Sequence, residues 1–169
     1  MELHASVQAQ ENKSDNFSFF KLYITNEKNE VLLVKWHGEW EIAGTRYNDT
    51  LSLSAFIEQM AADMGVTITD FKLAGLFTQK RQGNNSPVLL HYYKANYKVG
   101  SLKVPEDCTD IKWFSYEEAL GVIPYPMMIE IMKQITLNSG KVVGGAIETF
   151  KDVDGKVKYR LLEKFYLLN

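Results

Sequence analysis

The segment from Gly44 to Val66 constrains the fold more than any other part of this 169-residue sequence. Its apolar side chains recur every three or four residues, which places them on one face of a helix: Leu53, Phe56, Ile57, Met60 and Met64. Gly65 follows at the position where a left-handed residue ends a helix. Thr50 and Ser52 are both candidate N-caps, because each carries an oxygen that can accept from the free amides of the first turn. The segment therefore predicts a turn, an amphipathic helix and a stop.

The residues around this helix predict strands and two further helices. Aromatic and β-branched residues indicate a hairpin at 17–25 and 31–36 and a second at 66–78 and 88–99, with a break near Asp70 and a polar loop at 79–87. A short strand at 110–114 precedes Ser115, which forms a predicted capping box with Glu118. An apolar stripe predicts a last helix at 126–135.

The spacing of Gly44, Met60, Gly65 and Val66 resembles the signature of the Nudix hydrolase superfamily. The segment before it, with Trp40 and Ile42, resembles the family's lead-in, and residues 110–120 resemble a block that is common in Nudix domains after the second hairpin. The resemblance covers roughly residues 17–136. It implies an α/β fold, a Nudix-type α/β/α sandwich with a mixed central sheet, to which this chain adds a hairpin-like C-terminal extension.

The charged positions of the Nudix signature are mostly replaced. In the family, carboxylates on one face of the helix hold a divalent metal ion that polarises a pyrophosphate. Here Thr50 stands at the first Glu and Glu58 at the Arg, while Gln59, Ala62 and Asp63 stand at the remaining Glu positions, so Asp63 alone keeps a carboxylate. Glu58 lies about 140° around the helix from Asp63. Mg²⁺ requires oxygen ligands, usually carboxylates, so the metal site is expected to be largely lost.

The resemblance supplies the candidate site residues. Asp63 is the candidate metal ligand, and Asp63, Glu58 and Gln59 are the candidate catalytic residues. Glu106 and Asp107 lie in a region where some family members place a catalytic base. The candidate ligand contacts are Arg46, Lys80, Arg81 and His91. A solvated loop is the alternative for Lys80 and Arg81, and sheet packing is the alternative for His91.

Composition excludes several classes of function. A net charge of −2 gives no basic bias for nonspecific nucleic-acid binding. The aromatic residues, 12% of the sequence, leave stacking on single-stranded RNA open, and packing in strands is the alternative for them. Cys108 is the only cysteine, so an internal disulfide is excluded and a cytoplasmic location is expected. An apolar run of about 20 residues, as a membrane span needs, is absent, and so is a secretory signal.

Two segments lie outside the resemblance. Residues 1–16 are polar and predict a flexible N-terminal arm. Residues 137–169 form the C-terminal extension, where Asp154 and Gly155 indicate the turn of a hairpin. The apolar end at 165–168 predicts either packing on the domain or an interface, with a homodimer as the candidate assembly.

Three functions are consistent with these observations. The first is a domain that binds a nucleotide or a nucleoside-diphosphate-linked ligand with weak or no hydrolysis, because the metal-binding carboxylates are largely lost. The second is a metal-dependent Nudix pyrophosphohydrolase of nucleoside diphosphate derivatives, which would use Mg²⁺ or Mn²⁺ at a rearranged site built from Asp63 with Glu58, Glu106 or Asp107. The third is a protein-interaction module. Fold alone does not decide among them.

Overall fold

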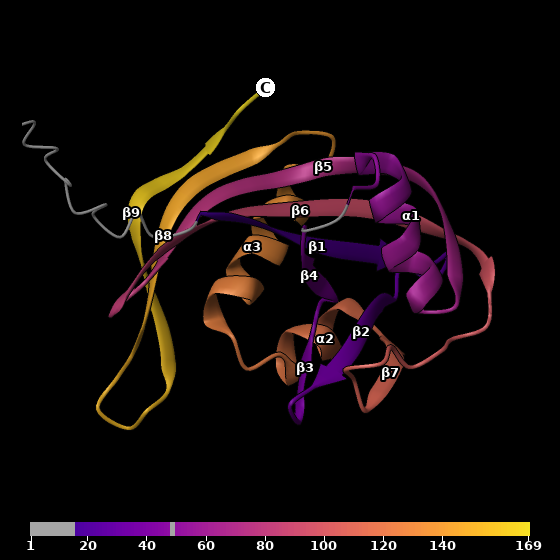
Figure 1. Ribbon diagram of the computed structural model, residues 1–169, viewed down its shortest axis with the longest axis horizontal. Coiled ribbons are helices and arrows are strands. Elements are labelled where there is room, and N and C mark those ends of the chain that lie inside the picture. Colours follow the sequence, from indigo (N-terminus) through magenta and orange to yellow (C-terminus); the bar gives the residue numbers. More distant parts are fainter. Residues whose placement is uncertain (1–15, 48–49) are drawn as a thin grey trace, which may run out of the picture.

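The computed structural model describes residues 16–47 and 50–169 and shows a mixed sheet with helices on both faces (Figure 1). This confirms the predicted α/β sandwich. The predicted N-terminal arm lies outside the described residues, except for Asn16. The strands are β1 (Phe17–Thr25), β2 (Val31–Trp36), β3 (Glu39–Glu41), β4 (Gly44–Arg46), β5 (Val66–Arg81), β6 (Asn84–Gly100), β7 (Asp110–Phe114), β8 (Val143–Lys151) and β9 (Val157–Leu167). The helices are α1 (Leu53–Asp63), α2 (Tyr116–Val122) and α3 (Pro126–Leu137).

The sheet follows the order β3-β2-β1-β6-β5-β8-β9, with β4 paired to β1 and β7 paired to β2. The β1–β6 and β5–β8 pairs are parallel and the other pairs are antiparallel. The predicted hairpin of β1 and β2 is short, because their ladder contains only Thr25 and Val31. Beyond it, β1 pairs with β4 and β2 pairs with β3 and β7. The two strands therefore diverge, and the candidate site lies where they separate.

Two hydrophobic clusters cover the two faces of the sheet. On one face, the apolar stripe of α1 packs against Leu22 and Ile24 of β1. On the other face, α2 and α3 pack against Tyr23, Phe77 and Tyr92. The residues of β1 alternate between the clusters because successive side chains of a strand point to opposite faces. The buried part of the α3 stripe consists of Met128, Ile131, Met132 and Ile135, as the sequence predicts.

The ends of α1 and α2 follow from local side-chain chemistry. Ser52, and not Thr50, is the N-cap of α1, and its hydroxyl accepts from the Ala55 amide. Gly65 ends α1 with a φ of +80°. Ser115 and Glu118 form the predicted capping box, in which the Glu118 amide donates to the Ser115 hydroxyl and the Ser115 amide donates to the Glu118 carboxylate. These contacts satisfy amides that have no partner within the helix.

The predicted polar loop at 79–87 is wrong, because β5 and β6 continue almost to the turn at Gln82 and Gly83. The cause lies outside the hairpin: β8 pairs with β5 up to Arg81 and Thr149, and the Gln82 amide donates to the Thr149 carbonyl at 2.8 Å. Polar composition therefore did not prevent strand formation, since a neighbouring strand supplied hydrogen-bond partners. The predicted break at Asp70 is confirmed by its φ of +54° and by a register shift.

The C-terminal extension adds two strands, β8 and β9, to the sheet (Figure 1, orange to yellow). Strand β8 runs parallel to β5 and buries Val143 and Ile147 completely. Strand β9 pairs with β8 at the end of the sheet, and Gly155 lies in the connecting turn, as predicted. Within the described ranges, no helix is long and apolar enough to cross a membrane.

Candidate functional site

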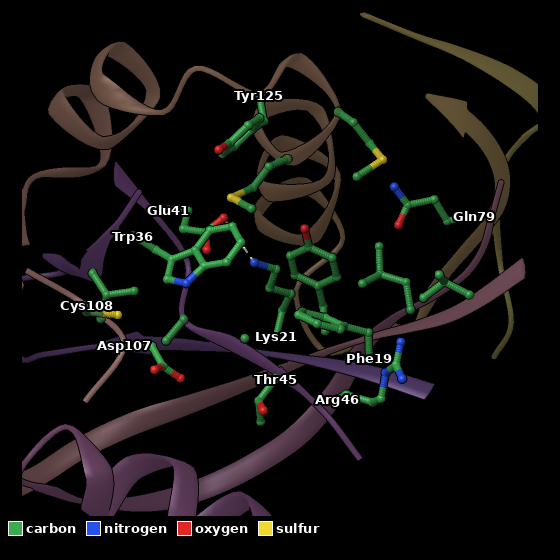
Figure 2. Close-up of a pocket in the computed structure, with 18 of the residues that line it drawn as sticks. Phe19, Lys21, Trp36, Glu41, Thr45, Arg46, Gln79, Asp107, Cys108 and Tyr125 are labelled. Carbon is green, nitrogen blue, oxygen red and sulfur yellow. Dashed lines mark ion pairs between the residues drawn. The ribbon is translucent and has the colours of Figure 1, made fainter. Parts of the chain in front are cut away.

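A cavity of about 1350 Å³ opens where β1 and β2 diverge. Its walls come from β1, β4, the C-terminal end of α1, the segment 103–108, the start of α3, and the tips of the β5–β6 and β8–β9 hairpins. Ligand pockets usually enclose about 300–1000 Å³, so this cavity has room for a ligand larger than a mononucleotide. Figure 2 shows part of the lining.

A buried ion pair lies on the floor of the cavity. The Lys21 ammonium donates to the Ile42 carbonyl at 2.9 Å and lies 3.4 Å from the Glu41 carboxylate (Figure 2). Burial lowers the pKa of Lys21, and the charge of Glu41 opposes this shift. An ammonium group carries three donors, so these two contacts leave one N–H of Lys21 for another acceptor.

The cavity gathers the buried polar side chains of the described residues. Lys21, Gln79 and Thr149 are the polar or charged residues classed as buried there, and all three line this cavity. Tyr92 lines it too, and its hydroxyl has no hydrogen-bond partner. Burial raises the pKa of Tyr92, so the phenol stays protonated and remains a donor. Burying the unpaired Tyr92 hydroxyl costs free energy, which favours a role for it in binding.

Aromatic side chains form further parts of the wall. Trp36, Tyr125 and Phe19 line the cavity (Figure 2). Trp36 is 41% exposed although it is large and apolar, and its ring lies 4.0 Å from that of His37. Exposed aromatic faces of this kind can stack against a planar ring of a ligand.

The two ends of the cavity differ in charge. Asp63 of α1 and Glu106 and Asp107 of the segment 103–108 outnumber Lys103 at one end, whereas Arg46 of β4 and Arg81 of β5 lie at the other. Figure 2 shows Asp107 on the side of Trp36 and Arg46 on the side of Gln79. Such a separation orients a ligand that has distinct charged and uncharged parts.

The predicted catalytic residues lie unevenly around the cavity. Asp63 lines it, but Glu58 and Gln59 are not among its lining residues. The Gln59 amide instead donates to the Asp63 carboxylate at 2.8 Å. Glu106 and Asp107 line the same cavity. Over residues 16–47 and 50–169, no three His, Cys, Asp or Glu side chains come close enough together to hold a metal ion. The structure therefore brings Asp63, Glu106 and Asp107 to one cavity without gathering the three carboxylates around one point.

Of the four predicted ligand contacts, two line the cavity and two do not. Arg46 and Arg81 line the cavity, and the Arg46 guanidinium lies 3.8 Å from the centre of the Phe17 ring. Lys80 and His91 are not lining residues. The His91 ring lies 4.5 Å from the ring of Phe20, burial lowers the pKa of His91, and its Nδ1 atom has no partner.

Sequence reasoning missed Lys21, Glu41, Gln79, Tyr92 and Thr149. One signal could have identified Lys21, because it is the single charged residue inside the apolar strand 17–25 and a charge there needs a partner. The other four carry no local signal. Gln79, Tyr92 and Thr149 converge because the strand order brings β1, β6, β5 and β8 side by side, and Glu41 comes from β3.

At the level of sequence, no family model and no curated protein matches this chain. The structure is similar to the mutator MutT protein from Bacillus halodurans, with a TM-score of 0.68 and 18% identity over 86% of this chain and 97% of the other. It is also similar to the Nudix domain of NrtR from Shewanella oneidensis, solved with ADP ribose, with a TM-score of 0.63 and 14% identity over 73% and 88%. A third similar structure is a UDP-X diphosphatase, with a TM-score of 0.57 and 14% identity over 77% and 67%. The chain therefore has the Nudix fold.

Proposed function

We propose that this protein binds a nucleotide or a nucleoside-diphosphate-linked ligand in the cavity and hydrolyses it weakly or not at all. The observation that carries the proposal is a large cavity, with aromatic rings and buried polar groups in its wall, beside a helix that offers it a single carboxylate, Asp63. The ligand class is taken from the similar structures, one of which was solved with ADP ribose. Arg46 and Arg81 are proposed as ligand contacts because they line the cavity.

Weak hydrolysis follows from the donor set around Asp63. A hard divalent ion needs several oxygen ligands, and the Asp63 carboxylate already accepts a hydrogen bond from Gln59. Ala62, at the position of a family carboxylate, offers none. The helix therefore lacks the ligands that would hold a metal ion against a pyrophosphate.

Calorimetry on the full chain tests this proposal. ADP-ribose is titrated with EDTA present and again with Mg²⁺ or Mn²⁺, and the same samples are assayed for phosphate-containing products. Saturable binding with negligible turnover is expected. Rapid metal-dependent turnover would contradict the claim of weak hydrolysis, and absence of binding to ADP-ribose and other nucleotides would contradict the ligand class.

A metal-dependent pyrophosphohydrolase is the second candidate, and one observation favours it. Asp63, Glu106 and Asp107 come from separate segments yet line one cavity, and metal sites are defined in space rather than in sequence. With Mg²⁺ or Mn²⁺ as its cofactor, this enzyme would lose turnover in Asp63→Ala and keep it in Glu117→Ala, which removes an exposed carboxylate on α2. Equal turnover in both variants would exclude this candidate.

We also propose that the chain forms a homodimer through β9. This strand lies at the end of the sheet, and an edge strand offers unpaired amides and carbonyls to another chain. It also exposes large apolar side chains, including Leu162 at 50% and Tyr166 at 45%. Light scattering should give the mass of two chains for the natural protein and of one chain for Leu162→Lys. A natural protein with the mass of one chain would contradict the proposal.

The location that we propose is the cytoplasm. Cys108 is the only cysteine in the sequence, and burial raises the pKa of its thiol, so the reactive thiolate is disfavoured. Free thiols of this kind are typical of reducing compartments. Fractionation of the native cells with an antibody to the protein would test the location, and recovery with secreted or membrane material would contradict it.

A further inference from the structure

The cavity wall formed by β5 and β8 carries positive charge without a neighbouring carboxylate in the lining. Arg81 at the end of β5 and Lys151 at the end of β8 both line the cavity. The described lining residues of β5, β6, β8 and β9 include no acidic residue. The four acidic lining residues lie elsewhere, on β3, on α1 and at positions 106 and 107.

Strand pairing places these two cations within reach of one ligand group. Arg81 pairs with Thr149 across the parallel β5–β8 ladder, and Lys151 lies two residues further along β8, on the same face. Strand spacing and rise put the Cα atoms of Arg81 and Lys151 roughly 8 Å apart. Both side chains are long enough to meet over that distance.

Buried polar groups complete this wall. Gln79 lies two residues before Arg81 on the same face of β5, is only 7% exposed, and points into the cavity (Figure 2). The Thr149 hydroxyl donates to the Lys80 carbonyl at 3.4 Å, a long hydrogen bond. The Tyr92 hydroxyl, buried without a partner, lies on the neighbouring strand β6. A cationic rim above buried donors is the arrangement that an anion requires.

We propose that Arg81, Lys151 and Gln79 form a subsite that binds a phosphoryl group of the ligand without a divalent metal ion. The inference rests on the proposed nucleotide-binding function, and it adds where and how the anionic part of the ligand is held. In this arrangement the phosphoryl group lies at the hairpin end, away from Asp63. The planar ring of the ligand lies toward Trp36 and Tyr125.

The chemistry of the wall supports phosphate in particular. A guanidinium group donates two parallel N–H bonds to a phosphate, and a lysine ammonium acts as a point charge beside it. Arg81 lowers the pKa of Lys21 through its charge, so its field reaches the cavity floor. The opposite end carries three carboxylates, those of Asp63, Glu106 and Asp107, against the one ammonium group of Lys103, so its net negative charge would repel a phosphate in the absence of a metal ion.

The C-terminal hairpin is essential to this subsite. Lys151 and Thr149 belong to β8, and Val157 of β9 also lines the cavity. This segment lies outside the region that resembles the Nudix signature and its flanks. The extension would thereby select ligands with a phosphoryl group at this end over ligands that carry only a nucleoside.

The test compares four variants of the full chain by calorimetry in EDTA, with ADP-ribose, adenosine and inorganic pyrophosphate as probes. Arg81→Ala and Lys151→Ala remove the proposed contacts. Arg160→Ala and Lys158→Ala are the matched controls, because they remove the same charges from β9 and neither residue lines the cavity. Thermal unfolding of each variant checks that the fold is intact, and Arg81→Gln replaces Arg81→Ala if that variant unfolds early.

The expected result is binding of ADP-ribose in EDTA that weakens at least about tenfold in Arg81→Ala, as for the loss of a charged hydrogen bond. Lys151→Ala should weaken it several-fold, whereas the controls and the binding of adenosine stay within about twofold. Affinity for ADP-ribose should fall with added salt, and less steeply in Arg81→Ala.

Three outcomes would overturn the subsite: equal affinity in Arg81→Ala and Arg160→Ala, equal losses for adenosine and ADP-ribose, or binding that appears only with Mg²⁺. A natural protein that binds neither adenosine nor ADP-ribose contradicts the proposed function instead. The pyrophosphate titration then decides the subsite separately: binding that Arg81→Ala abolishes supports it, and absence of binding overturns it.

Discussion

At the scale of single residues, the cavity floor could not be read from the sequence. Lys21 and Glu41 are twenty residues apart, and they meet because β1 pairs with β4 next to the short strand that carries Glu41. The capping box of Ser115 and Glu118 was predictable, because its partners are three residues apart and local geometry alone brings them together. Residue-scale prediction therefore succeeded where a contact was local and failed where strand pairing created it.

Removing Glu41 should destabilise the protein, because the Lys21 ammonium would stay buried without its counter-ion. Glu41→Ala is expected to lower the free energy of unfolding by about 3 kcal/mol, as for a broken buried ion pair. The double variant Lys21→Met with Glu41→Leu should recover most of this loss, because it removes both charges. Urea unfolding measures each value, and Glu39→Ala, which removes an exposed carboxylate at the start of β3, is the control. Equal stability of Glu41→Ala and Glu39→Ala would contradict the prediction.

Tyr23 should make the folded protein sensitive to alkaline pH. Burial raises the pKa of Tyr23 from 10.0 to about 12. Below pH 10 the phenol is neutral in both states, and between pH 10 and about 12 the unfolded chain loses the proton while the folded chain keeps it. The free energy of unfolding therefore falls as pH rises through this range. Tyr23→Phe should make that fall shallower by about 1.4 kcal/mol per pH unit. Urea unfolding at several pH values checks this, and an unchanged slope would contradict it.

At the scale of elements, helix α1 was predictable to within one residue at its end. Three local signals predicted it: the apolar spacing, the serine before the helix and the glycine after it. The structure confirms all three. The β5–β6 hairpin was less predictable, since its polar tip is held as strand by hydrogen bonding to β8. A sequence pattern describes what an element prefers alone, whereas a neighbouring strand can extend it.

Gly65 should be the most sensitive glycine at a helix end. A Cβ atom there would lie 2.1 Å from the Ser101 carbonyl oxygen, and the φ is +80°. Gly155 has a φ of +76°, but a Cβ would meet no atom within 4 Å. Gly155→Ala should cost about 1 kcal/mol for the left-handed backbone, and Gly65→Ala about 3 kcal/mol because the clash adds to that cost. Urea unfolding compares the free energy of unfolding of the two variants. An equal decrease in both would contradict the prediction, because the left-handed backbone alone would then account for the cost.

At the scale of the whole molecule, the fold class was predictable and the role of the C-terminal extension was not. The order of strands and helices up to α3 resembles one fold closely enough to imply a mixed sheet between helices, and the structure confirms it. The hairpin at 143–167 was predictable from its turn residues, but its attachment to β5 was not. Parallel pairing with a distant strand leaves no periodic signal that distinguishes a core strand from an appended one.

Truncation after Leu137 should therefore unfold the domain rather than release an independent core. It removes β8, which contains the buried residues Val143 and Ile147 and pairs with β5 next to Phe77. Loss of two fully buried aliphatic side chains costs about 2–5 kcal/mol for each, which together approaches the whole stability of a domain of this size.

Circular dichroism during urea unfolding should show no cooperative transition for the truncated chain. Lys164→Ala, which alters only an exposed side chain of β9, should keep a transition close to that of the natural protein. If the truncated chain unfolds cooperatively at the urea midpoint of the natural protein, the prediction is wrong and the core folds without the extension. The phosphoryl subsite at Lys151 would then depend on a segment that the core does not need for folding.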